Sequence, residues 1–355
     1  MTTPDKKIRV AISVGDANGI GYEIIVKTLL DKNILDFFTP VIFGSTKHLS
    51  QYKDLLNDNS LQFFGINSAE QAVDRKINVV NLWKEPAKLE FGNPTETSGK
   101  YAYESLKAAA ESVQNGVCDV LVTAPINKKN IQSENFNFPG HTEYLGEVWK
   151  GKPLMFLVTE MLKVSLVTQH IPLKDVAQKI NKENITEKVE ALHQSLKVDF
   201  GVRKPKIAVL GLNPHSGDNG LLGSEEQEII MPAIQSLYEK GMLVFGPYAA
   251  DSFFTSSNIE TFDAVLGMYH DQALIPFKTL CFEEGVNYTA SLPFVRTSPD
   301  HGTAYDIAGK GIADETSFKE AVFTAIEIFK NRTEYAELTQ NVLKTREIKL
   351  ERESR

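Results

Sequence analysis

Short apolar segments alternate with amphipathic helical segments along most of this 355-residue chain. Strands that are joined through helices pair in parallel and are covered on both faces, so each of them is apolar throughout. The strand-like segments are 8–14, 41–44, 117–124, 155–159, 164–169, 207–212, 243–246 and 264–268, and the helical patterns are 22–30, 46–56, 95–114, 186–200, 224–240 and 317–350. This alternation predicts an α/β fold with a largely parallel sheet, built as two domains or one large unit.

Charge and cysteine content narrow the functional class. Lys and Arg number 38 against 46 Asp and Glu, and the resulting net charge of -8 disfavours nucleic acid as a main partner, although a local basic pocket could hold one small anion. Cys118 and Cys281 are too few for a disulfide framework or a four-thiolate metal site. The chain shows neither an apolar signal segment nor a run of about 20 apolar residues. We therefore expect a soluble, cytoplasmic protein with no membrane or nucleic-acid partner.

Three of the seven histidines directly follow apolar strands, namely His170, His215 and His270. The carboxyl ends of strands border the ligand crevice in open α/β sheets, so three imidazoles there could converge on one cation. Three neutral imidazoles suit zinc or a similar divalent ion that keeps a position open for substrate. Three unrelated, hydrogen-bonded histidines are the alternative, because a single histidine has many structural uses.

Charged and polar residues cluster around His270 and just beyond it. Asp271 could orient an imidazole or a substrate amine, or act only as a helix N-cap. Lys278 could bind an anion or transfer a proton, or be a solvated surface charge. Asn287 and Arg296 bracket a short segment, and a guanidinium near a lysine would match a carboxylate or a phosphate.

One turn precedes a helix in a way that allows anion binding, whereas the glycine turn at 15–21, taken alone, only joins a strand to a helix. Pro139-Gly140 leads into His141-Thr142-Glu143, and if this helix start faces the crevice, its free amides and the Thr142 hydroxyl would bind a phosphate. Otherwise Thr142 is a cap and His141 is a surface residue. The glycine turn at 15–21 has neither the G-x-G-x-x-G spacing nor that of a P-loop. A second glycine-rich segment, 301–311, is a tight surface loop on its spacing alone, with a nucleotide role as the alternative.

Seven ordered motifs between about Ile8 and Ala313 together resemble the 4-hydroxythreonine-4-phosphate dehydrogenase family of the vitamin B6 pathway. They are Gly15-Asp16-x-x-Gly19-Ile20-Gly21-x-Glu23, Thr123-Ala124-Pro125-Ile126-Asn127-Lys128, Gly140-His141-Thr142-Glu143, Leu212-Asn213-Pro214-His215-x-Gly217-Asp218, Gly246-Pro247-Tyr248-x-x-Asp251, Tyr269-His270-Asp271-Gln272 and His301-Gly302-Thr303-Ala304-x-Asp306-Ile307-Ala308-Gly309-Lys310-Gly311. The first turn departs from the family with Ala17-Asn18 and Tyr22, where relatives usually have prolines.

The resemblance implies a fold like that of isocitrate and isopropylmalate dehydrogenases. Two α/β subdomains would surround a largely parallel or mixed sheet, with the active-site cleft between them. We expect residues 8–125 with 245–345 to form the cofactor-side subdomain, residues 126–244 to form the central, dimer-forming subdomain, and residues 346–355 to be a charged tail.

The same resemblance assigns roles to individual residues. It implies a divalent metal ion held by His170, His215 and His270, and a phosphorylated substrate bound by His141, Thr142, Lys278, Asn287 and Arg296. The last motif resembles the cofactor loop of isocitrate dehydrogenases, which implies NAD or NADP at His301, Gly302, Thr303, Asp306 and Gly309. Candidates for proton transfer or orientation are Lys278, Asp251 and Asp271. Ligand type favours zinc, and magnesium, manganese or cobalt stay open.

The family substrate, 4-phosphooxy-L-threonine, is oxidised at C3 with NAD(P)+ and decarboxylated to 3-amino-2-oxopropyl phosphate. Family active sites lie at a homodimer interface where both subunits supply metal ligands, so we expect a homodimer and an inactive monomer. Three alternatives stay open from the sequence. They are a dehydrogenase for threonate or erythronate phosphate, a three-histidine zinc hydrolase, and a non-catalytic binding protein that kept the pocket.

Overall fold

The apolar segments pair into one sheet, of twelve strands within the residues that the structure describes, in the order β3-β4-β2-β1-β5-β12-β11-β6-β7-β10-β8-β9. The structure is a computed structural model and describes residues 7–58 and 60–340. The strands are β1 (Arg9–Ser13), β2 (Thr39–Gly44), β3 (Phe63–Ile66), β4 (Ile77–Asn81), β5 (Val120–Thr123), β6 (Leu154–Val158), β7 (Lys163–Leu166), β8 (Lys206–Leu210), β9 (Leu243–Tyr248), β10 (Ala264–Gly267), β11 (Val286–Ala290) and β12 (Val295–Pro299).

Strand direction reverses in the centre of the sheet. One parallel half of the sheet consists of β3, β4, β2, β1, β5 and β12, and the other consists of β7, β10, β8 and β9. Between them, β12 with β11, β11 with β6, and β6 with β7 are antiparallel pairs. Because there are three reversals, the two parallel halves run in opposite directions.

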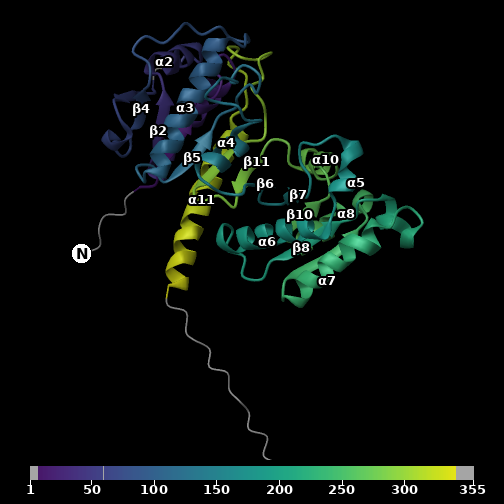
Figure 1. Cartoon of the computed structure of the whole chain (residues 1–355). Coiled ribbons are helices and arrows are strands. Elements are labelled where there is room, and N and C mark those ends of the chain that lie inside the picture. The colour runs from purple at the N-terminus through teal and green to yellow at the C-terminus, as the bar shows by residue number, and fades with distance from the viewer. Residues whose placement is uncertain (1–6, 59, 341–355) are drawn as a thin grey trace, which may run out of the picture.

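Helices cover both faces of the sheet and form an α/β/α sandwich in two lobes (Figure 1). One continuous apolar cluster packs α1, α2, α6, α7 and α11 against one face, while α3 with α4 and α8 to α10 cover the other face of the two halves. The helices are α1 (Gly21–Thr28), α2 (Thr46–Leu55), α3 (Glu96–Gln114), α4 (His141–Val148), α5 (Val176–Lys179), α6 (Lys182–Val198), α7 (Met231–Glu239), α8 (Ala250–Phe253), α9 (Ser256–Thr261), α10 (His270–Leu280) and α11 (Thr316–Thr339).

Alternate residues of a strand pack against the helices on opposite faces of the sheet, which explains the uninterrupted apolar segments. In β1, Ile12 belongs to the cluster on one face and Ala11 to the cluster on the other. Strands buried on both faces read as continuous apolar segments. The predicted α/β class with a mostly parallel sheet is therefore confirmed, and all eight predicted strands are present with ends that differ by a few residues.

The sequence did not predict β3, β4, β11 and β12. Strands β11 and β12 escape the apolar pattern because polar side chains interrupt them, among them Asn287 and Arg296. The predicted helix at 224–240 begins with a π-helical turn, Glu226–Ile230, before α7. The predicted end of the last helix near 350 and the charged tail at 346–355 lie outside the described residues.

Strand pairing places β9 and β10 beside β8 and β7, so residues 163–267 supply the whole second parallel half. The subdomain boundaries proposed from the sequence stay a prediction.

Across residues 7–58 and 60–340, no helix combines the length and the apolar character needed to cross a membrane.

The first glycine turn is a buried junction that positions the loop at 301–311. Asp16 is fully buried, and its carboxylate accepts hydrogen bonds from Ser98 Oγ at 3.0 Å and Asn130 Nδ2 at 2.6 Å. A Cβ atom at Gly19 would come within 2.7 Å of the Thr303 carbonyl oxygen, so only glycine allows the loop to approach this closely. The first glycine turn thus packs directly against the predicted cofactor loop at Thr303.

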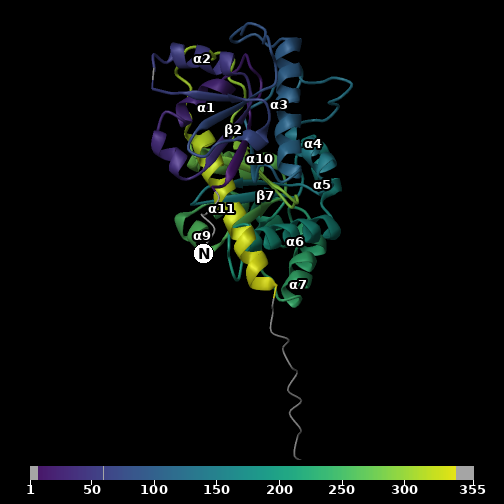
Figure 2. The same cartoon turned by 90° about the vertical axis from the view of Figure 1, so that its left-hand side faces the viewer.

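A second buried carboxylate connects α11 to the central strands of the sheet. This helix runs beside those strands and past both lobes (Figure 2). Asp199 is 2% exposed and accepts hydrogen bonds from Arg332 Nε at 2.7 Å, from the Tyr288 hydroxyl at 2.7 Å and from Ser195 Oγ at 2.6 Å. Burial and the Asp199 charge raise the pKa of Tyr288, so its hydroxyl stays protonated and donates. Because Tyr288 is part of β11, the network fixes that strand as well as the helix.

We predict that Arg332→Met destabilises the fold because it leaves the Asp199 carboxylate buried without its charged partner. Loss of one member of a buried pair costs about 3–5 kcal/mol, and the lower value applies here because Arg332 is partly exposed. The free energy of unfolding from urea denaturation should fall by about 3 kcal/mol. Lys330→Met, at an exposed position of the same helix, is the control and should change it by less than about 0.5 kcal/mol. Equal losses in the two variants would contradict this role of the network.

Candidate active site

All five predicted substrate residues line one cavity of about 290 Å³ between the two halves of the sheet. The cavity also contains one predicted metal ligand, His170, and two residues of the predicted cofactor loop, His301 and Gly302. The substrate residues come from α4, α10, β11 and β12, which are far apart in the sequence; they are His141, Thr142, Lys278, Asn287 and Arg296. Residues predicted to bind the substrate, the metal and the cofactor therefore line the same cavity.

Arg296 is a buried cation that forms no ion pair with the residues that the structure describes. It is 2% exposed, and its guanidinium donates to Thr123 Oγ1, at 2.6 Å from Nη2, and to Thr289 Oγ1, at 3.0 Å from Nη1. These hydroxyls satisfy N–H groups but supply no negative charge. Burial lowers the pKa of Arg296, and the nearby Glu143 carboxylate raises it in part. A guanidinium placed in this way favours an anionic ligand.

Three other side chains of the cavity have buried polar atoms that find no partner in the described part of the chain: His141 Nε2, Asn287 Oδ1 and His301 Nε2. Such orphaned atoms are rare in native structures, so their concentration here indicates a ligand. Burial lowers the pKa of His141 well below its usual value, and the charges of Arg296 and Lys128 lower it further. His141 is therefore neutral near pH 7 and can donate or accept a hydrogen bond through Nε2.

Helix α4 begins at the cavity. Its N-cap is Gly140, and Thr142 is the second helical residue, so the alternative that Thr142 caps the helix is wrong. The first N–H groups of a helix have no helical partner and carry partial positive charge. A Cβ atom at Gly140 would lie 3.7 Å from Lys128 Cε, which places a lysine beside the helix start. Helix start, Lys128 and Arg296 thus make one wall of the cavity electropositive.

Lys278 reaches the cavity from α10, which packs in the other lobe. Its ammonium is 3.1 Å from Asp300 Oδ2 and also donates to the Asp300 carbonyl oxygen at 3.4 Å. Burial raises the pKa of Asp300, and the charge of Lys278 lowers it in part. Because Asp300 precedes His301, this ion pair connects α10 to the predicted cofactor loop.

The three predicted metal ligands are not assembled by the single chain. His170 and His270 lie close together, with ring centroids 5.9 Å apart, a separation compatible with two imidazoles on one ion at about 2.0 Å each. His215 lies elsewhere, in a second cavity of about 370 Å³ that Asp251 also lines. Among residues 7–58 and 60–340, no three His, Cys, Asp or Glu side chains are close enough to hold a metal ion.

The adjacent imidazoles nevertheless fit a divalent ion in their chemistry. Burial lowers the pKa of His170, and the charge of Lys128 lowers it further, so this ring is neutral and can bind a metal. His270 Nδ1 is 2.7 Å from Asp271 Oδ1, an arrangement that orients the ring and leaves Nε2 available. A metal site of three histidines would need one ligand in addition to His170 and His270, which lie together in the single chain.

The predicted cofactor residues lie on the loop between β12 and α11. His301 and Gly302 line the cavity, whereas Thr303, Asp306 and Gly309 lie beyond it. The loop is anchored at both ends, since the Thr303 carbonyl accepts a hydrogen bond from the amide of Ile20 and Gly309 packs against the ring of Phe91. Gly309 has φ +74°, and a Cβ atom there would come within 2.5 Å of that ring.

Among the cavity residues that received no role from the sequence are Thr123, Lys128, Glu143 and Asp300. The first three stand inside quoted motifs. Thr123 is the last residue of β5 and Lys128 follows that strand, at the carboxyl end where α/β proteins bind ligands. Asp300 comes between β12 and the glycine-rich loop. Position relative to strand ends could have identified these residues, but their contacts could not be read from the sequence.

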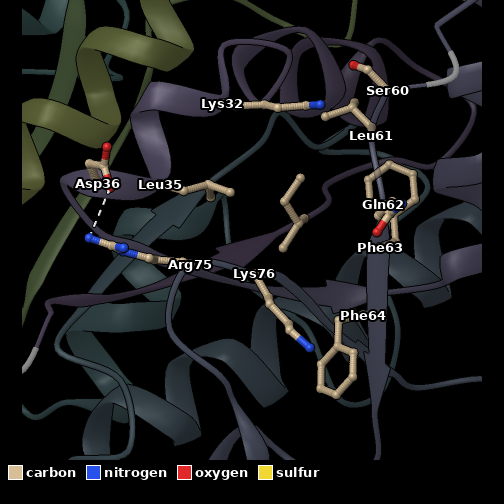
Figure 3. Close-up of a pocket in the computed structure, with 11 residues that line it drawn as sticks. Lys32, Leu35, Asp36, Ser60, Leu61, Gln62, Phe63, Phe64, Arg75 and Lys76 are labelled. Atoms are coloured by element: carbon tan, nitrogen blue, oxygen red, sulfur yellow. Dashed lines mark ion pairs between the residues drawn. The ribbon is translucent and has the colours of Figure 1, made fainter.

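A larger cavity, of about 580 Å³, lies at the far edge of the sheet beside β3 and contains none of the predicted site residues (Figure 3). Three of its charged side chains have local partners. Arg75 forms an ion pair with Asp36 at 3.6 Å, and Lys76 Nζ lies 4.3 Å from the centre of the Phe64 ring. Among the described residues that line it, none has an orphaned buried polar atom.

Residues 36–325 match the sequence model of the family described as "Pyridoxal phosphate biosynthetic protein PdxA". The chain belongs to the PdxA family. A 4-hydroxythreonine-4-phosphate dehydrogenase of Bacteroides thetaiotaomicron is 52% identical over 330 residues, which cover 92% of this chain and 90% of the relative. A D-threonate 4-phosphate dehydrogenase of Cupriavidus necator is 39% identical over 328 residues, 91% and 98% of the two chains. A crystal structure of 4-hydroxythreonine-4-phosphate dehydrogenase from Klebsiella pneumoniae has a TM-score of 0.80 at 34% identity and covers 92% of this chain and 99% of its own.

PdxA membership confirms the family resemblance and the fold class, and it confirms that the protein is an enzyme, an oxidoreductase. It also supports a phosphorylated small molecule as the substrate. The roles of the individual site residues, the metal, the choice of NAD or NADP and the homodimer stay predictions.

We predict that His141 makes stability dependent on pH in the absence of ligand. Its pKa is lower in the folded than in the unfolded chain, so its contribution is present above the unfolded value of about 6.5 and is lost as the pH falls toward the folded value. Between pH 8 and pH 5, the free energy of unfolding of wild type relative to His141→Gln should fall by about 1 kcal/mol or more. A difference that stays constant across this range would contradict the buried, neutral imidazole.

Proposed function

We propose that the protein oxidises 4-phosphooxy-L-threonine at C3 with NAD or NADP and decarboxylates the product to 3-amino-2-oxopropyl phosphate, in the cytoplasmic synthesis of pyridoxal/pyridoxine 5'-phosphate. The observation that carries this proposal is the cavity itself. It combines cationic groups for two anions, orphaned polar atoms, a predicted metal ligand and the start of the predicted cofactor loop. PdxA membership supports the same reaction class.

The cationic groups suit the two anionic ends of this substrate. Lys278 comes from α10, and Arg296, Lys128 and the start of α4 together supply a second positive region. We assign a phosphate and a carboxylate to these groups without dividing them further. The orphaned Asn287 Oδ1 can accept a hydrogen bond from the substrate ammonium or hydroxyl, and His141 Nε2 can bond a neighbouring polar atom.

The side chains then account for positioning and proton transfer. A divalent ion at the imidazoles would act as a Lewis acid toward the C3 oxygen, and nicotinamide would accept the C3 hydride. Oxidation places a ketone β to the carboxylate, which is the arrangement that loses CO2. Lys278, held by Asp300, is the candidate to donate the proton that replaces the lost carboxylate. Asp271 is the candidate to orient His270, and Asp251 is a further candidate for proton transfer.

A homodimer would complete the metal site. His215 is exposed and separated from the pair of His170 and His270, as expected if both subunits supply ligands. Exposed apolar side chains accompany these histidines: Leu221 is 79% exposed on the segment after His215, and Ile275 is 63% exposed on α10. Burying them against a second copy would remove apolar surface from water. We therefore expect an inactive monomer.

The proposal is tested by following NAD(P)H absorbance with a panel of phosphorylated hydroxy acids. We expect turnover of 4-phosphooxy-L-threonine, its loss with a chelator, and its recovery with Zn2+, Mn2+, Mg2+ or Co2+. His215→Ala should abolish turnover and keep the wild-type circular dichroism spectrum, and normal rates in that variant would remove His215 from the mechanism. Faster oxidation of D-threonate or erythronate phosphate would select the alternative substrate class. Hydrolysis without NAD(P)H would select the zinc hydrolase, and binding without turnover would select the binding protein.

We predict that Arg296→Met lowers kcat/KM because it removes a charge-assisted contact with an anionic group of the substrate. Hydrogen bonds to charged groups contribute about 1.5–3 kcal/mol, which corresponds to a loss of roughly 10- to 150-fold. Arg203→Met replaces an exposed arginine and should leave kcat/KM within about twofold of wild type. If Arg296→Met binds substrate and inorganic phosphate as tightly as wild type, the anion-binding role is wrong.

A further inference from the structure

The backbone that presents His215 adopts an unfavourable conformation. Five consecutive residues, 215–219, have positive φ values between 42° and 80°, and only Gly217 among them lacks a Cβ atom. Side chains disfavour this left-handed region, and such strain persists only where the surroundings fix the backbone. The turn must therefore be held by contacts outside itself.

A buried carboxylate supplies one set of these contacts. Glu226 is 2% exposed, and its Oε1 accepts hydrogen bonds from the amides of Leu212 and Asn213, both at 2.7 Å. Its Oε2 accepts a third from Asn213 Nδ2 at 2.9 Å. A Cβ atom at Gly217 would come within 2.6 Å of the same Oε2, so the left-handed turn closes directly over this carboxylate. The side chain of Glu226 thus contacts both ends of the segment that presents His215.

The backbone conformation of Glu226 is also unusual. The residue begins the π-helical turn Glu226–Ile230 that precedes α7. Single π-helical turns inside helices change the direction of a side chain and often occur at functional sites. Here the turn directs a carboxylate into the protein, where it meets amide hydrogens. This turn is therefore part of the support for His215.

Gln272 forms hydrogen bonds with the backbone before His215 and with the backbone before His270. Its Oε1 accepts a hydrogen bond from the amide of Met268 at 2.7 Å, and its Nε2 donates to the carbonyl of Gly211 at 2.7 Å. Met268 lies between β10 and His270, and Gly211 lies between β8 and His215. One amide side chain therefore connects the two histidine-bearing segments.

We propose that Glu226 and Gln272 are positioning residues that fix His215 and His270 for metal binding. This inference rests on the proposed function of the histidines as metal ligands. Glu226 holds the left-handed turn through three hydrogen bonds, and Gln272 sets the spacing between the two segments through two. Neither side chain needs to touch the ion or the substrate. Support of this kind typically changes metal affinity by about 10- to 100-fold.

The test measures Co2+ binding to the metal-free enzyme from its visible absorption. We expect Glu226→Gln, which turns an acceptor into a donor facing Asn213 Nδ2, and Gln272→Met, which removes both bonds, to weaken Co2+ binding roughly 10- to 100-fold. Gln272→Glu keeps the acceptor for Met268 but sets an oxygen against the Gly211 carbonyl, and it should weaken binding as well. Saturating Co2+ should restore kcat toward wild type and leave KM for the substrate unchanged. Glu228→Gln, an exposed change in the same turn, is the control.

Other outcomes separate this inference from the proposed function. If the Glu226 and Gln272 variants lose thermal stability without metal but bind Co2+ as tightly as wild type, their role is only structural and the inference is wrong. His215→Ala serves as the reference. If that variant also binds Co2+ normally, the metal assignment of the proposed function fails. If it binds Co2+ weakly while the other variants bind normally, the positioning inference alone fails.

Discussion

Arg296 keeps its charge inside the protein, and its hydrogen-bond partners among the described residues are the hydroxyl groups of Thr123 and Thr289. Burying an unpaired charge is costly, so the surrounding fold must hold this side chain in place and leave room for an anion. Both threonines belong to strands that flank β12. Together with Lys128 and the start of α4, this placement makes one wall of the cavity electropositive, and the charge of Arg296 adds to burial in lowering the pKa of His141.

The reversal of strand direction in the centre of the sheet makes that placement possible. Antiparallel β11 and β12 lie between two parallel halves, and Asn287 and Arg296 project from them into the cavity. Helices α4 and α10 reach the same cavity from different lobes, and they bring Thr142 and Lys278. A purely parallel sheet would place ligands only along the carboxyl ends of its strands.

The sequence predicted the parallel strands well because each is apolar on both faces. It missed β11 and β12 because side chains such as Asn287 and Arg296 serve the site rather than the core. Local rules are expected to fail at functional sites for this reason. The five predicted substrate residues came from the family resemblance, and of these only His141 and Thr142 stand inside the quoted motifs. Asp300 and Lys128 became visible only when the cavity was formed, since their contacts join segments distant in the chain.

The chain's own sequence determined the α/β class, the position of His170, His215 and His270 after strands and the PdxA family, because periodicity and ordered motifs are local properties. Only the tertiary structure decided which histidines meet. Strands β7, β10 and β8 are neighbours in the sheet, yet the left-handed turn at 215–219 sets His215 apart while His170 and His270 lie together. The path of a turn depends on buried partners such as Glu226, which no local pattern specifies.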